Sequence, residues 1–445
     1  MFEHERHRGG ERAVLVHVEF SNDKNFADAL SEFSDLAVSA GVLIIEEVIA
    51  KRHAPDAKFY VGSGKAQEIA ELIQSQNVDI ALFNQDLSPS QERNLETEFK
   101  CRVLDRTGLI LDIFAQRARS HEGKLQVELA QLKHLSTRLV RGWSHLERQK
   151  GGIGLRGPGE TQLETDRRLL AKRIKQIERR LEKVHKQREQ GRQARRKVPI
   201  PTVSLVGYTN TGKSSLFNGL TKADVFTADQ LFATLDATLR RLPLNDQMEV
   251  ILADTVGFIR DLPHDLVAAF RSTLQESREA NMLLHVVDAA DPDRQEKMLN
   301  VNEVLKEIAA DSVEQLEVYN KIDLLEQDAR IDRNAEGQAT RVWLSAKSGA
   351  GLDLLLQVLA ERFEQERTQG WLKLSSQEGQ IRAALFELSA VKDEQYDDDG
   401  CWILEISLAQ VDYQRFCAQY SFDGTRLSIK SPVAGAAKAT YNAPA

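Results

Sequence analysis

The chain contains the octapeptide Gly207-Tyr208-Thr209-Asn210-Thr211-Gly212-Lys213-Ser214, which fits the phosphate-loop pattern G-x-x-x-x-G-K-[ST]. The apolar, β-rich run 202–206 before it predicts a buried strand, and a helix should begin near Lys213. Gly207 allows a sharp turn, and Gly212 allows the backbone to approach phosphate oxygens closely. The alternative is a glycine-rich turn with a solvated lysine. The flanking strand and helix patterns favour a phosphate loop in an α/β fold.

Two side chains of this loop have expected chemical roles. Lys213 should reach the β- and γ-phosphates of a nucleoside triphosphate. Ser214 should ligate Mg²⁺ through its hydroxyl. The octapeptide therefore predicts a nucleotide with bound Mg²⁺.

Four shorter segments follow the loop in the order typical of a guanine-nucleotide switch. They are Phe232-Ala233-Thr234-Leu235-Asp236, Asp254-Thr255-Val256-Gly257, Asn320-Lys321-Ile322-Asp323 and Ser345-Ala346-Lys347. Each should lie where a strand ends and the chain turns over the nucleotide. One such segment could arise by chance, but five in this order predict a GTP- and GDP-binding enzyme that hydrolyses GTP. All of their residues are candidate nucleotide-binding positions.

The segments 232–236 and 254–257 are expected to sense the γ-phosphate. Asp254 can hold Mg²⁺ through a water molecule, and the Gly257 N–H can donate to the γ-phosphate. Thr234 is the candidate second protein ligand of Mg²⁺, in a loop that closes on the triphosphate and relaxes after hydrolysis. Thr227 and Thr238 are nearby competitors. The candidate catalytic residues are Lys213, Thr234 and Gly257, and the candidate metal ligands are Ser214 and Thr234.

Phe258 occupies the position at which Ras-like GTPases carry a glutamine that orients the attacking water. A phenylalanine side chain cannot hydrogen-bond water. We therefore expect slow intrinsic hydrolysis, with the missing group supplied from elsewhere in the chain or by a partner. The plainer interpretation, that Phe258 packs in a hydrophobic pocket, is compatible with this.

The segments 320–323 and 345–347 predict selection of guanine. The Asp323 carboxylate can accept hydrogen bonds from N1–H and the 2-amino group of guanine, whereas adenine lacks the amino group. Hydrogen bonds to a charged group contribute roughly 1.5–3 kcal/mol each, so GTP should be strongly favoured over ATP. Lys321 should lie over the base, and Ser345-Ala346-Lys347 should complete the pocket from its backbone.

Composition and charge are those of a soluble globular protein. The 445 residues, with 42% hydrophobic and 28% charged content, suffice for about three domains. The longest apolar runs are strand-sized and the first eight residues lack an apolar core, so we expect neither a transmembrane helix nor a signal peptide. Cys101, Cys401 and Cys417 have neither metal nor disulfide spacing, which fits a reducing cytoplasm. The net charge of −8 by itself does not indicate nucleic acid.

One segment is strongly basic despite that net charge. Residues 163–198 carry fourteen lysines and arginines against five acidic residues. Apolar residues recur there with helical spacing, namely Leu170, Ile174, Ile177, Leu181 and Val184. We expect a basic amphipathic helix ending near Gly191 and paired with a helix over 123–148. A solvated linker helix is the alternative to an RNA-binding surface.

The turn of this expected hairpin, 150–160, contains five glycines and one proline and is bordered by Arg148, Lys150 and Arg156. A flexible, positively charged tip is suited to entering RNA. The alternative is a plain mobile loop, but the length of the segment favours a functional loop.

The N-terminal part alternates strand and helix patterns, which predicts a small α/β domain with a parallel sheet. Its expected strands are 13–20, 42–49, 78–83 and 102–104, and its expected helices are 25–40, 66–76 and 89–99. Gly62-Ser63-Gly64-Lys65 lacks the full phosphate-loop pattern, so we interpret it as a helix-capping turn.

The C-terminal part predicts a small α+β domain. Its expected strands are 383–386, 401–408 and 426–429, with a helix over 411–420, and the tail 431–445 should be disordered. The predicted domains are therefore 1–120 (α/β), 121–198 (basic helical hairpin with a glycine-rich tip), 199–366 (P-loop GTPase domain) and 367–432 (α+β), followed by a disordered tail at 433–445.

The whole chain resembles the HflX family of ribosome-associated GTPases. Beyond the nucleotide motifs, the resemblance rests on the runs 103–114 (VLDRTGLILDIF), 123–132 (GKLQVELAQL) and 156–161 (RGPGET), and it covers roughly residues 1–365. It implies a monomer that binds the large ribosomal subunit near the peptidyl-transferase centre, with the glycine-rich loop approaching the rRNA. Some members of the family split stalled or stress-inactivated ribosomes. ATP hydrolysis and RNA unwinding have been attributed to the N-terminal part of some.

Two other functions stay open at this point. One is an RNA chaperone or NTP-dependent unwinding protein regulated by its GTPase domain, and the other is a switch for a protein partner without RNA. The leading hypothesis is a GTP-dependent, cytoplasmic ribosome-binding factor whose hydrolysis is stimulated by the ribosome.

Overall fold

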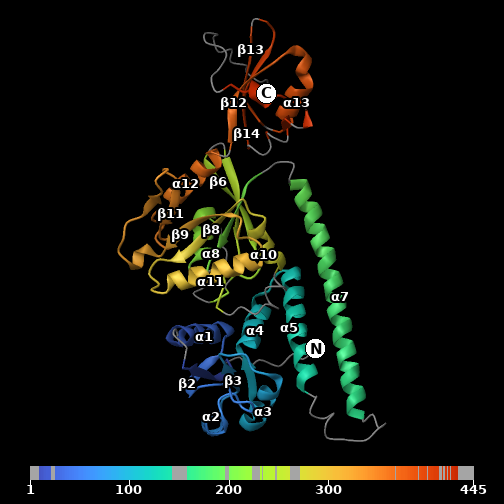
Figure 1. Cartoon of the computed structure of the whole chain (residues 1–445), viewed down its shortest axis with the longest axis vertical. Coiled ribbons are helices and arrows are strands. Elements are labelled where there is room, and N and C mark those ends of the chain that lie inside the picture. Colours follow the sequence, from blue (N-terminus) through green and yellow to red (C-terminus); the bar gives the residue numbers. More distant parts are fainter. Residues whose placement is uncertain are drawn as a thin grey trace. The chain divides into compact units, whose positions relative to one another are not determined.

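A computed structural model defines the architecture of the chain (Figure 1). The structure describes residues 10–21, 26–142, 158–195, 200–222, 231–232, 234–245, 248–260, 271–365, 367–388, 390–397 and 399–409, together with most of 413–428. By contacts the chain divides into two units. The first consists of 1–191, 201–242 and 250–352, and the second of 192–200, 243–249 and 353–445.

The N-terminal part of the first unit is an α/β domain whose parallel sheet has the order β2-β1-β3-β4. Its strands are β1 (Arg12–Phe20), β2 (Leu43–Arg52), β3 (Ile80–Phe83) and β4 (Arg102–Asp105), and its helices are α1 (Phe26–Ala40), α2 (Ser63–Gln76), α3 (Pro89–Phe99) and α4 (Arg106–Arg117). The predicted strands and helices are confirmed within a few residues. Helix α4 was not predicted from the sequence. Gly62 is the N-cap of α2, with a φ of 88°, as a helix-capping turn requires.

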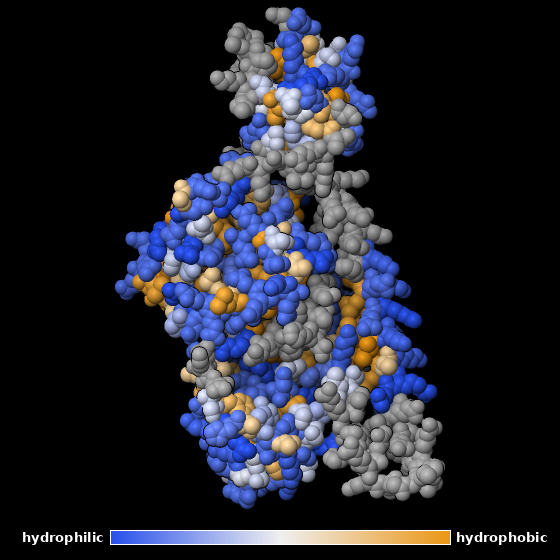
Figure 2. All heavy atoms as spheres, viewed as in Figure 1, coloured by the Kyte–Doolittle hydropathy of each residue, from blue (hydrophilic) through white to orange (hydrophobic). Residues whose placement is uncertain are grey.

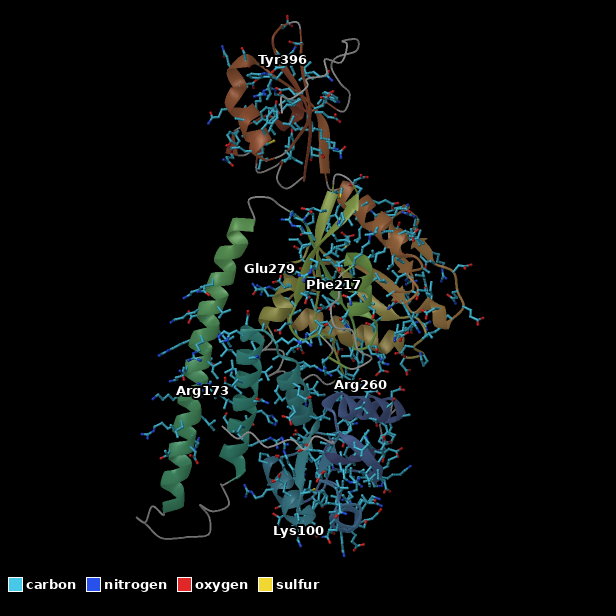
Figure 3. All side chains as sticks on the ribbon, turned by 180° about the vertical axis from the view of Figure 1, so that it is seen from behind. Lys100, Arg173, Phe217, Arg260, Glu279 and Tyr396 are labelled. Carbon is cyan, nitrogen blue, oxygen red and sulfur yellow. The ribbon has the colours of Figure 1, made fainter. Side chains whose placement is uncertain are left out.

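A helical hairpin follows. It consists of α5 (His121–Gly142) and α7 (Pro158–Arg195), which lie side by side in Figure 1. Leu125, Leu129 and Ile177 form a buried seam between them, supported by Leu132, Ile174 and Leu181. Arg173 on α7 (labelled in Figure 3) also pairs with Glu128 on α5 at 2.5 Å. Because α7 begins at Pro158, Gly159 belongs to the helix and not to the tip. The rest of the tip, residues 143–157, lies outside the described residues.

The motif-bearing part of the first unit is built on a seven-stranded sheet with the order β10-β11-β9-β8-β5-β7-β6. The central strands β8, β5 and β7 run parallel, so the loops after their carboxyl ends meet at one edge. The strands are β5 (Thr202–Val206), β6 (Thr238–Asn245), β7 (Met248–Asp254), β8 (Met282–Asp288), β9 (Glu314–Asn320), β10 (Arg330–Arg333) and β11 (Ala339–Trp343). The helices are α8 (Lys213–Thr221), α10 (Arg271–Arg278) and α11 (Arg294–Glu307); α12 (Leu352–Gln365) follows and, apart from Leu352, belongs to the second unit.

The α/β domain and the motif-bearing part share one apolar core. A single cluster contains Phe33 and Phe114 from the former and Phe232, Leu235 and Phe258 from the latter. The rings of Phe114 and Phe232 meet edge to face, with 4.6 Å between centroids. The loops of the motif-bearing part therefore fold against the α/β domain and not only against their own sheet.

The second unit contains a three-stranded antiparallel sheet with the order β12-β14-β13. Its elements are β12 (Arg367–Leu374), α13 (Gly379–Glu387), β13 (Val391–Tyr396), β14 (Trp402–Ala409) and short 3-10 turns at Ser376–Glu378 and Gly424–Arg426. The predicted strand 401–408 is confirmed as β14. The predicted helix 411–420 and the tail 431–445 lie partly or wholly outside the described residues.

Two predictions for this unit are wrong. Residues 383–386 lie in α13 and not in a strand. A Ser375–Glu378 capping box precedes α13, and helix-forming Ala383, Ala384 and Leu385 outweigh the short apolar run that suggested a strand. Where a strand over 426–429 was predicted, the chain makes a 3-10 turn over Gly424–Arg426 and then an isolated bridge between Ser428 and Trp371, and Ile429 lies outside the described residues.

Across the described part of the chain, no helix is long and apolar enough to span a membrane. Hydrophilic residues dominate the visible surface, including the outer edge of α7 (Figure 2).

Candidate functional site

The octapeptide forms a tight turn from β5 into α8, as its sequence predicts. Gly212 is the N-cap of α8 and has a φ of 88°, which an L side chain rarely adopts. A Cβ there would also lie 2.3 Å from the Nδ2 atom of Asn320. The first turn of α8 thus directs its N–H groups into the loop, where they can bind an anion.

Lys213 is buried beneath this turn, with 6% of its surface exposed. Its Nζ atom donates to the carbonyl oxygen of Tyr208 at 2.6 Å. Burial lowers the pKa of Lys213 to about 8, against the opposing effect of Asp254. A Cβ on Gly257 would lie 3.0 Å from the same Nζ atom. The ammonium group and the Gly257 backbone therefore face one small space, suited to the terminal phosphates of a nucleotide.

Three oxygen-bearing side chains from three segments converge beside the turn. Ser214 Oγ lies 2.7 Å from Asp254 Oδ2 and 2.8 Å from Thr234 Oγ1. Thr234 Oγ1 donates to the same carboxylate oxygen at 2.9 Å. Burial raises the pKa of Asp254, and its other oxygen, Oδ1, is buried without a hydrogen-bond partner among the described residues.

This set of groups fits Mg²⁺. Hydroxyl and carboxylate oxygens are the ligands that this hard cation prefers, and a buried carboxylate oxygen without a partner costs free energy until a cation or water reaches it. Of the alternatives to Thr234, Thr238 begins β6, whereas Thr227 lies outside the described residues, as does Ala233.

The loops after β9 and β11 are fastened to each other and to the phosphate loop. Asn320 donates to the carbonyl oxygen of Thr211 at 2.8 Å and accepts from the N–H of Ala346 at 2.9 Å. Ser345 Oγ donates to Asp323 Oδ1 at 2.6 Å. The structure thus orients the Asp323 carboxylate from a neighbouring loop, as a base-reading group requires.

Not every residue of these segments points into the site. Lys321 Nζ pairs with Asp288 Oδ2 at 2.7 Å, and Lys347 is exposed. Thr255 Oγ1 donates to the β5 carbonyl of Leu205 at 2.6 Å, so its hydroxyl supports the sheet. Ile322, Val256 and Leu235 are buried apolar side chains.

Phe258 joins two segments of the site through its backbone. Its N–H donates to the carbonyl oxygen of Gly207 at 3.1 Å, and its carbonyl oxygen accepts from the N–H of Thr209 at 2.7 Å. The side chain is 1% exposed and lies in the shared apolar core. The interpretation that Phe258 packs in a hydrophobic pocket is therefore confirmed, and its ring cannot orient a water molecule.

Three residues around the phosphate loop, Glu32, Arg106 and Arg260, were missed from the sequence, and Tyr208 joins them. Tyr208 donates its hydroxyl to Glu32 of α1 and accepts from the N–H of Arg260 at 2.7 Å. Arg106 of α4 pairs with Glu32 and donates to the carbonyl oxygen of Arg260 at 3.0 Å. Arg260, labelled in Figure 3, lies three residues after the end of the switch segment 254–257. No motif marks Glu32 or Arg106, because the residues that they contact near the phosphate loop, Tyr208 and Arg260, lie 176 and 154 residues away in sequence.

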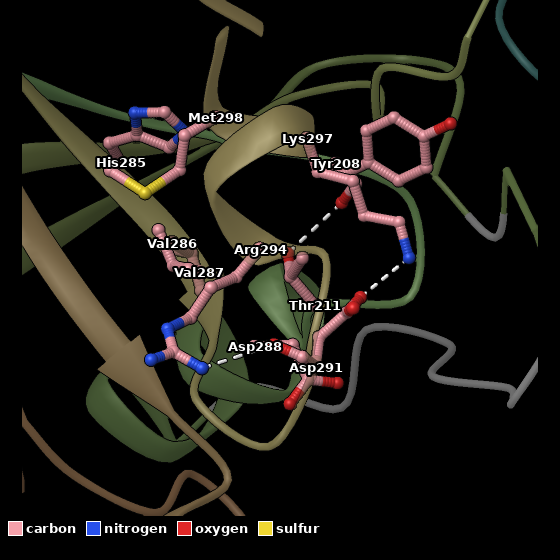
Figure 4. A pocket seen from close by; sticks show the side chains of 10 residues that line it. All are labelled: Tyr208, Thr211, His285, Val286, Val287, Asp288, Asp291, Arg294, Lys297 and Met298. Carbon is pink, nitrogen blue, oxygen red and sulfur yellow. Dashed lines mark hydrogen bonds and ion pairs between the residues drawn. The ribbon is translucent and has the colours of Figure 1, made fainter. Parts of the chain in front are cut away.

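A small cavity lies beside the phosphate loop, which contributes Tyr208 and Thr211 to its lining (Figure 4). It is lined by ten residues, among them His285 and the ion-paired Asp291 and Lys297, whose charged atoms are 2.5 Å apart. Its volume is about 10 Å³, room for about one water molecule. It is therefore too small for a nucleotide.

Family models match the chain in three consecutive ranges. Residues 27–115 match a model described as "GTP-binding GTPase N-terminal", residues 117–195 one described as "GTP-binding GTPase Middle Region", and residues 202–321 one described as "50S ribosome-binding GTPase". The first two ranges correspond to the α/β domain and the helical hairpin.

Curated relatives cover nearly the whole chain. GTPase HflX of Escherichia coli (strain K12) is 60% identical over 416 residues, which is 93% of this chain and 97% of the relative. GTPase HflX of Caldanaerobacter subterraneus subsp. tengcongensis is 45% identical over 393 residues, covering 88% and 90%. Among solved structures, a complex titled "crystal structure of SsGBP and GDP complex" is 25% identical, with a TM-score of 0.47, over 79% of this chain and 98% of that one.

Proposed function

Because this chain belongs to the HflX family of GTPases, we propose that it uses GTP to bind the large ribosomal subunit and to split or rescue stalled or inactive ribosomes under stress. GTP binding and hydrolysis follow from the family itself. The ribosomal partner is supported by the family description of residues 202–321 and by the charge of the hairpin. A ribosomal partner implies that the protein acts in the cytoplasm.

The nucleotide chemistry is assigned to residues that the fold brings together. Lys213 and the N–H groups at the start of α8 neutralise charge on the β- and γ-phosphates. Ser214 and Thr234 would hold Mg²⁺ directly and Asp254 through water, and the ion would neutralise charge developing on the phosphate oxygens. Gly257, whose backbone faces the same space as the Lys213 ammonium group, would offer its N–H to the γ-phosphate. These residues bind and orient the triphosphate, but none of them activates water.

The proposal that hydrolysis needs a partner rests on one observation, the burial of Phe258. Its ring is packed in the core and its backbone is bonded to the phosphate loop, so no rotamer change could deliver a polar group from this position. Of the two sources left open by the sequence, another part of the chain or a partner, we propose that the ribosome supplies the group that orients the attacking water. Supplying such a group in trans accelerates hydrolysis by about 10³–10⁵-fold in other GTPases.

The hairpin offers a continuous positive face for rRNA. Opposite its apolar seam, α7 presents a stripe at spacings of three and four residues: Arg168, Lys172, Lys175, Arg179, Lys183 and Lys186, all exposed. Among the described residues, only Lys186 of this set is in an ion pair, with Glu182 at 2.9 Å. From residue 168 to 183 the stripe extends for about 22 Å. When such a row of unpaired cations binds RNA phosphates, counterions are released from the RNA, and this makes binding salt-dependent.

The first test is steady-state GTP turnover with and without purified large ribosomal subunits. Stimulation of a hundredfold or more is expected, and an Arg168→Gln/Lys172→Gln/Lys175→Gln variant should require more subunits to reach it. The matched control is Arg180→Gln, which lies on the same helix but off the stripe. Tight GTP binding without stimulation would reject the proposal. Salt-sensitive remodelling of protein-free structured RNA would instead favour an RNA chaperone.

A further inference from the structure

Ser120 caps the first helix of the hairpin. Its Oγ accepts from the N–H of Gly123 at 2.8 Å, and its carbonyl oxygen accepts from the N–H of Lys124 at 3.0 Å. This is the geometry of a serine N-cap. The hydroxyl has one further function, because its own proton is donated to a residue far along the chain.

That residue is Asp236, the last residue of the segment 232–236. Its carboxylate accepts from the N–H of Arg119 at 2.9 Å, the N–H of Ser120 at 2.8 Å and the Ser120 hydroxyl at 2.5 Å. A Cβ on Gly123 would lie 2.3 Å from Asp236 Oδ1, so the approach depends on a glycine in the first turn of α5. We call this arrangement of Asp236, Arg119 and Ser120 the clasp.

The clasp is connected to the Mg²⁺-binding groups by a very short piece of chain. Thr234, which contacts Ser214 and Asp254, is separated from Asp236 only by Leu235. Two residues span at most about 7 Å. Leu235 is itself 2% exposed and lies in the shared core. As long as the Asp236 carboxylate remains bonded to the N-terminus of α5, Thr234 can therefore move only a short distance away from Ser214 and Asp254.

The same segment is also held at its other end by the α/β domain. The N–H of Leu231 donates to Ser39 Oγ at 2.9 Å. Phe232 packs on Phe114 with a φ of 56°, a conformation that costs free energy for a bulky residue unless its surroundings impose it. The position of Thr234 is thus determined by contacts outside the GTPase motifs.

We infer that Ser120 is a positioning residue of the GTPase and that the clasp couples the γ-phosphate site to the RNA-binding hairpin. When Thr234 is drawn to Mg²⁺, Asp236 is placed on the N-terminus of α5. When Thr234 relaxes, the carboxylate withdraws from two backbone N–H groups and one hydroxyl. Coupling between sites is reciprocal, so a hairpin fixed by rRNA stabilises the closed form of 232–236. The claim that the clasp couples to RNA (the RNA half) rests on the proposed function. The claim that Ser120 positions the γ-phosphate site (the nucleotide half) does not.

A plain capping role does not account for the geometry. The Ser120 hydroxyl already satisfies the N–H of Gly123, so α5 has its cap without Asp236. The carboxylate adds three hydrogen bonds from a distance of more than 110 residues in sequence. It also places a negative charge at the positive end of a helix. Such bonds are among the stronger ones available to proteins.

The nucleotide half is tested by measuring affinities of Ser120→Ala for a non-hydrolysable GTP analogue and for GDP, both with Mg²⁺. The analogue affinity should fall about five- to twentyfold, which corresponds to common coupling free energies, and the GDP affinity should not change. Ser120→Thr should retain both. Ser136→Ala is the matched control, because Ser136 lies on α5 and donates only to the carbonyl oxygen of Lys133.

Asp236→Ala provides an independent variant. It should reduce the analogue affinity to a similar degree, and the Ser120→Ala/Asp236→Ala double variant should be little worse than either single one. Thermal unfolding of each variant shows whether it is folded. Equal losses for the analogue and GDP, or additive losses in the double variant, would reject the positioning role.

The RNA half is tested by binding of large ribosomal subunits in the presence of the analogue or GDP. The wild type should prefer the analogue-bound state, and Ser120→Ala should lose most of that preference. If the wild type does not bind subunits at all, the proposed function fails, whereas the nucleotide affinities still decide the clasp. If the wild type shows the preference and Ser120→Ala retains it in full, the clasp does not couple the γ-phosphate site to the hairpin.

Discussion

Asn320 lies so close to Gly212 that a Cβ on the glycine would be 2.3 Å from its Nδ2 atom. The asparagine of the base-reading loop therefore packs directly against the turn that cradles phosphate. Its amide also bridges the Thr211 carbonyl oxygen and the Ala346 N–H. The phosphate loop and the loops after β9 and β11 form one hydrogen-bonded block held together by Asn320, next to Asp323, the residue proposed to read the base.

Replacement of Asn320 by alanine should weaken this whole block. The side chain is 2% exposed, and its loss leaves a buried carbonyl oxygen and a buried N–H without partners, at a cost of about 2–3 kcal/mol in unfolding free energy. GDP and GTP affinities should fall together, because the change does not involve the γ-phosphate. Denaturant unfolding and nucleotide titration check this. A loss confined to GTP would contradict it.

Replacement of Asp323 by asparagine should change the preferred base. The carboxylate is oriented by Ser345 and is proposed to accept hydrogen bonds from guanine, whereas an amide could donate one to the 2-oxo group of xanthine. GTP affinity should fall at least a hundredfold, since two charge-assisted hydrogen bonds of about 1.5–3 kcal/mol are affected, and xanthosine triphosphate should be bound instead. Competition titrations measure both. Asp328→Asn, in the exposed chain after this loop, is the control and should leave GTP affinity unchanged.

Truncation of Phe258 should show that the residue is structural. Phe258→Ala should reduce the unfolding free energy by about 3–5 kcal/mol, whereas the nearly volume-conserving Phe258→Leu should cost less than about 1.5 kcal/mol. Phe258→Gln should not accelerate intrinsic hydrolysis, because the side chain at this position points into the core. Faster single turnover by Phe258→Gln would show that this side chain reaches the nucleotide.

Acid should destabilise the protein through two buried histidines. His17 and His285 are nearly inaccessible to solvent, and burial lowers the pKa of each to about 4. The unfolded chain takes up protons near pH 6.5, so this stabilisation is complete above that pH, is lost as the pH falls toward 4, and changes little below. Each histidine should contribute about 3 kcal/mol to this loss. Urea unfolding of His17→Phe between pH 7 and 4 should show a shallower decline than the wild type.

The nucleotide motifs could be predicted because they are local. Turn glycines, the strand before them and the helix after them lie within about fifteen residues, and parallel strands bring the later motifs to the same edge. The pairing of α5 with α7 could also be predicted, since apolar residues repeat at helical spacing on each helix, namely Leu125, Leu129 and Leu132 on α5 and Ile174, Ile177 and Leu181 on α7.

The contacts that hold the motifs in place could not be predicted in this way. Glu32, Arg106 and Ser120 are ordinary polar residues in sequence, and their partners lie 116 to 176 residues away. Nothing in a single sequence selects one carboxylate among 67 acidic residues for such a contact. The α13 error has a different cause, because a run of four apolar residues suits either a strand or a helix.

The apolar cluster shared by Phe33, Phe114, Phe232 and Phe258 also bears on how such a chain can be inherited. A GTPase part copied without its α/β neighbour would expose two phenylalanine faces and the strained Phe232 loop. An α/β part alone would expose the surface around Phe114. Neither half is a module that recombination could transplant intact, so the two are expected to evolve as one piece, with changes on one side of the cluster compensated on the other.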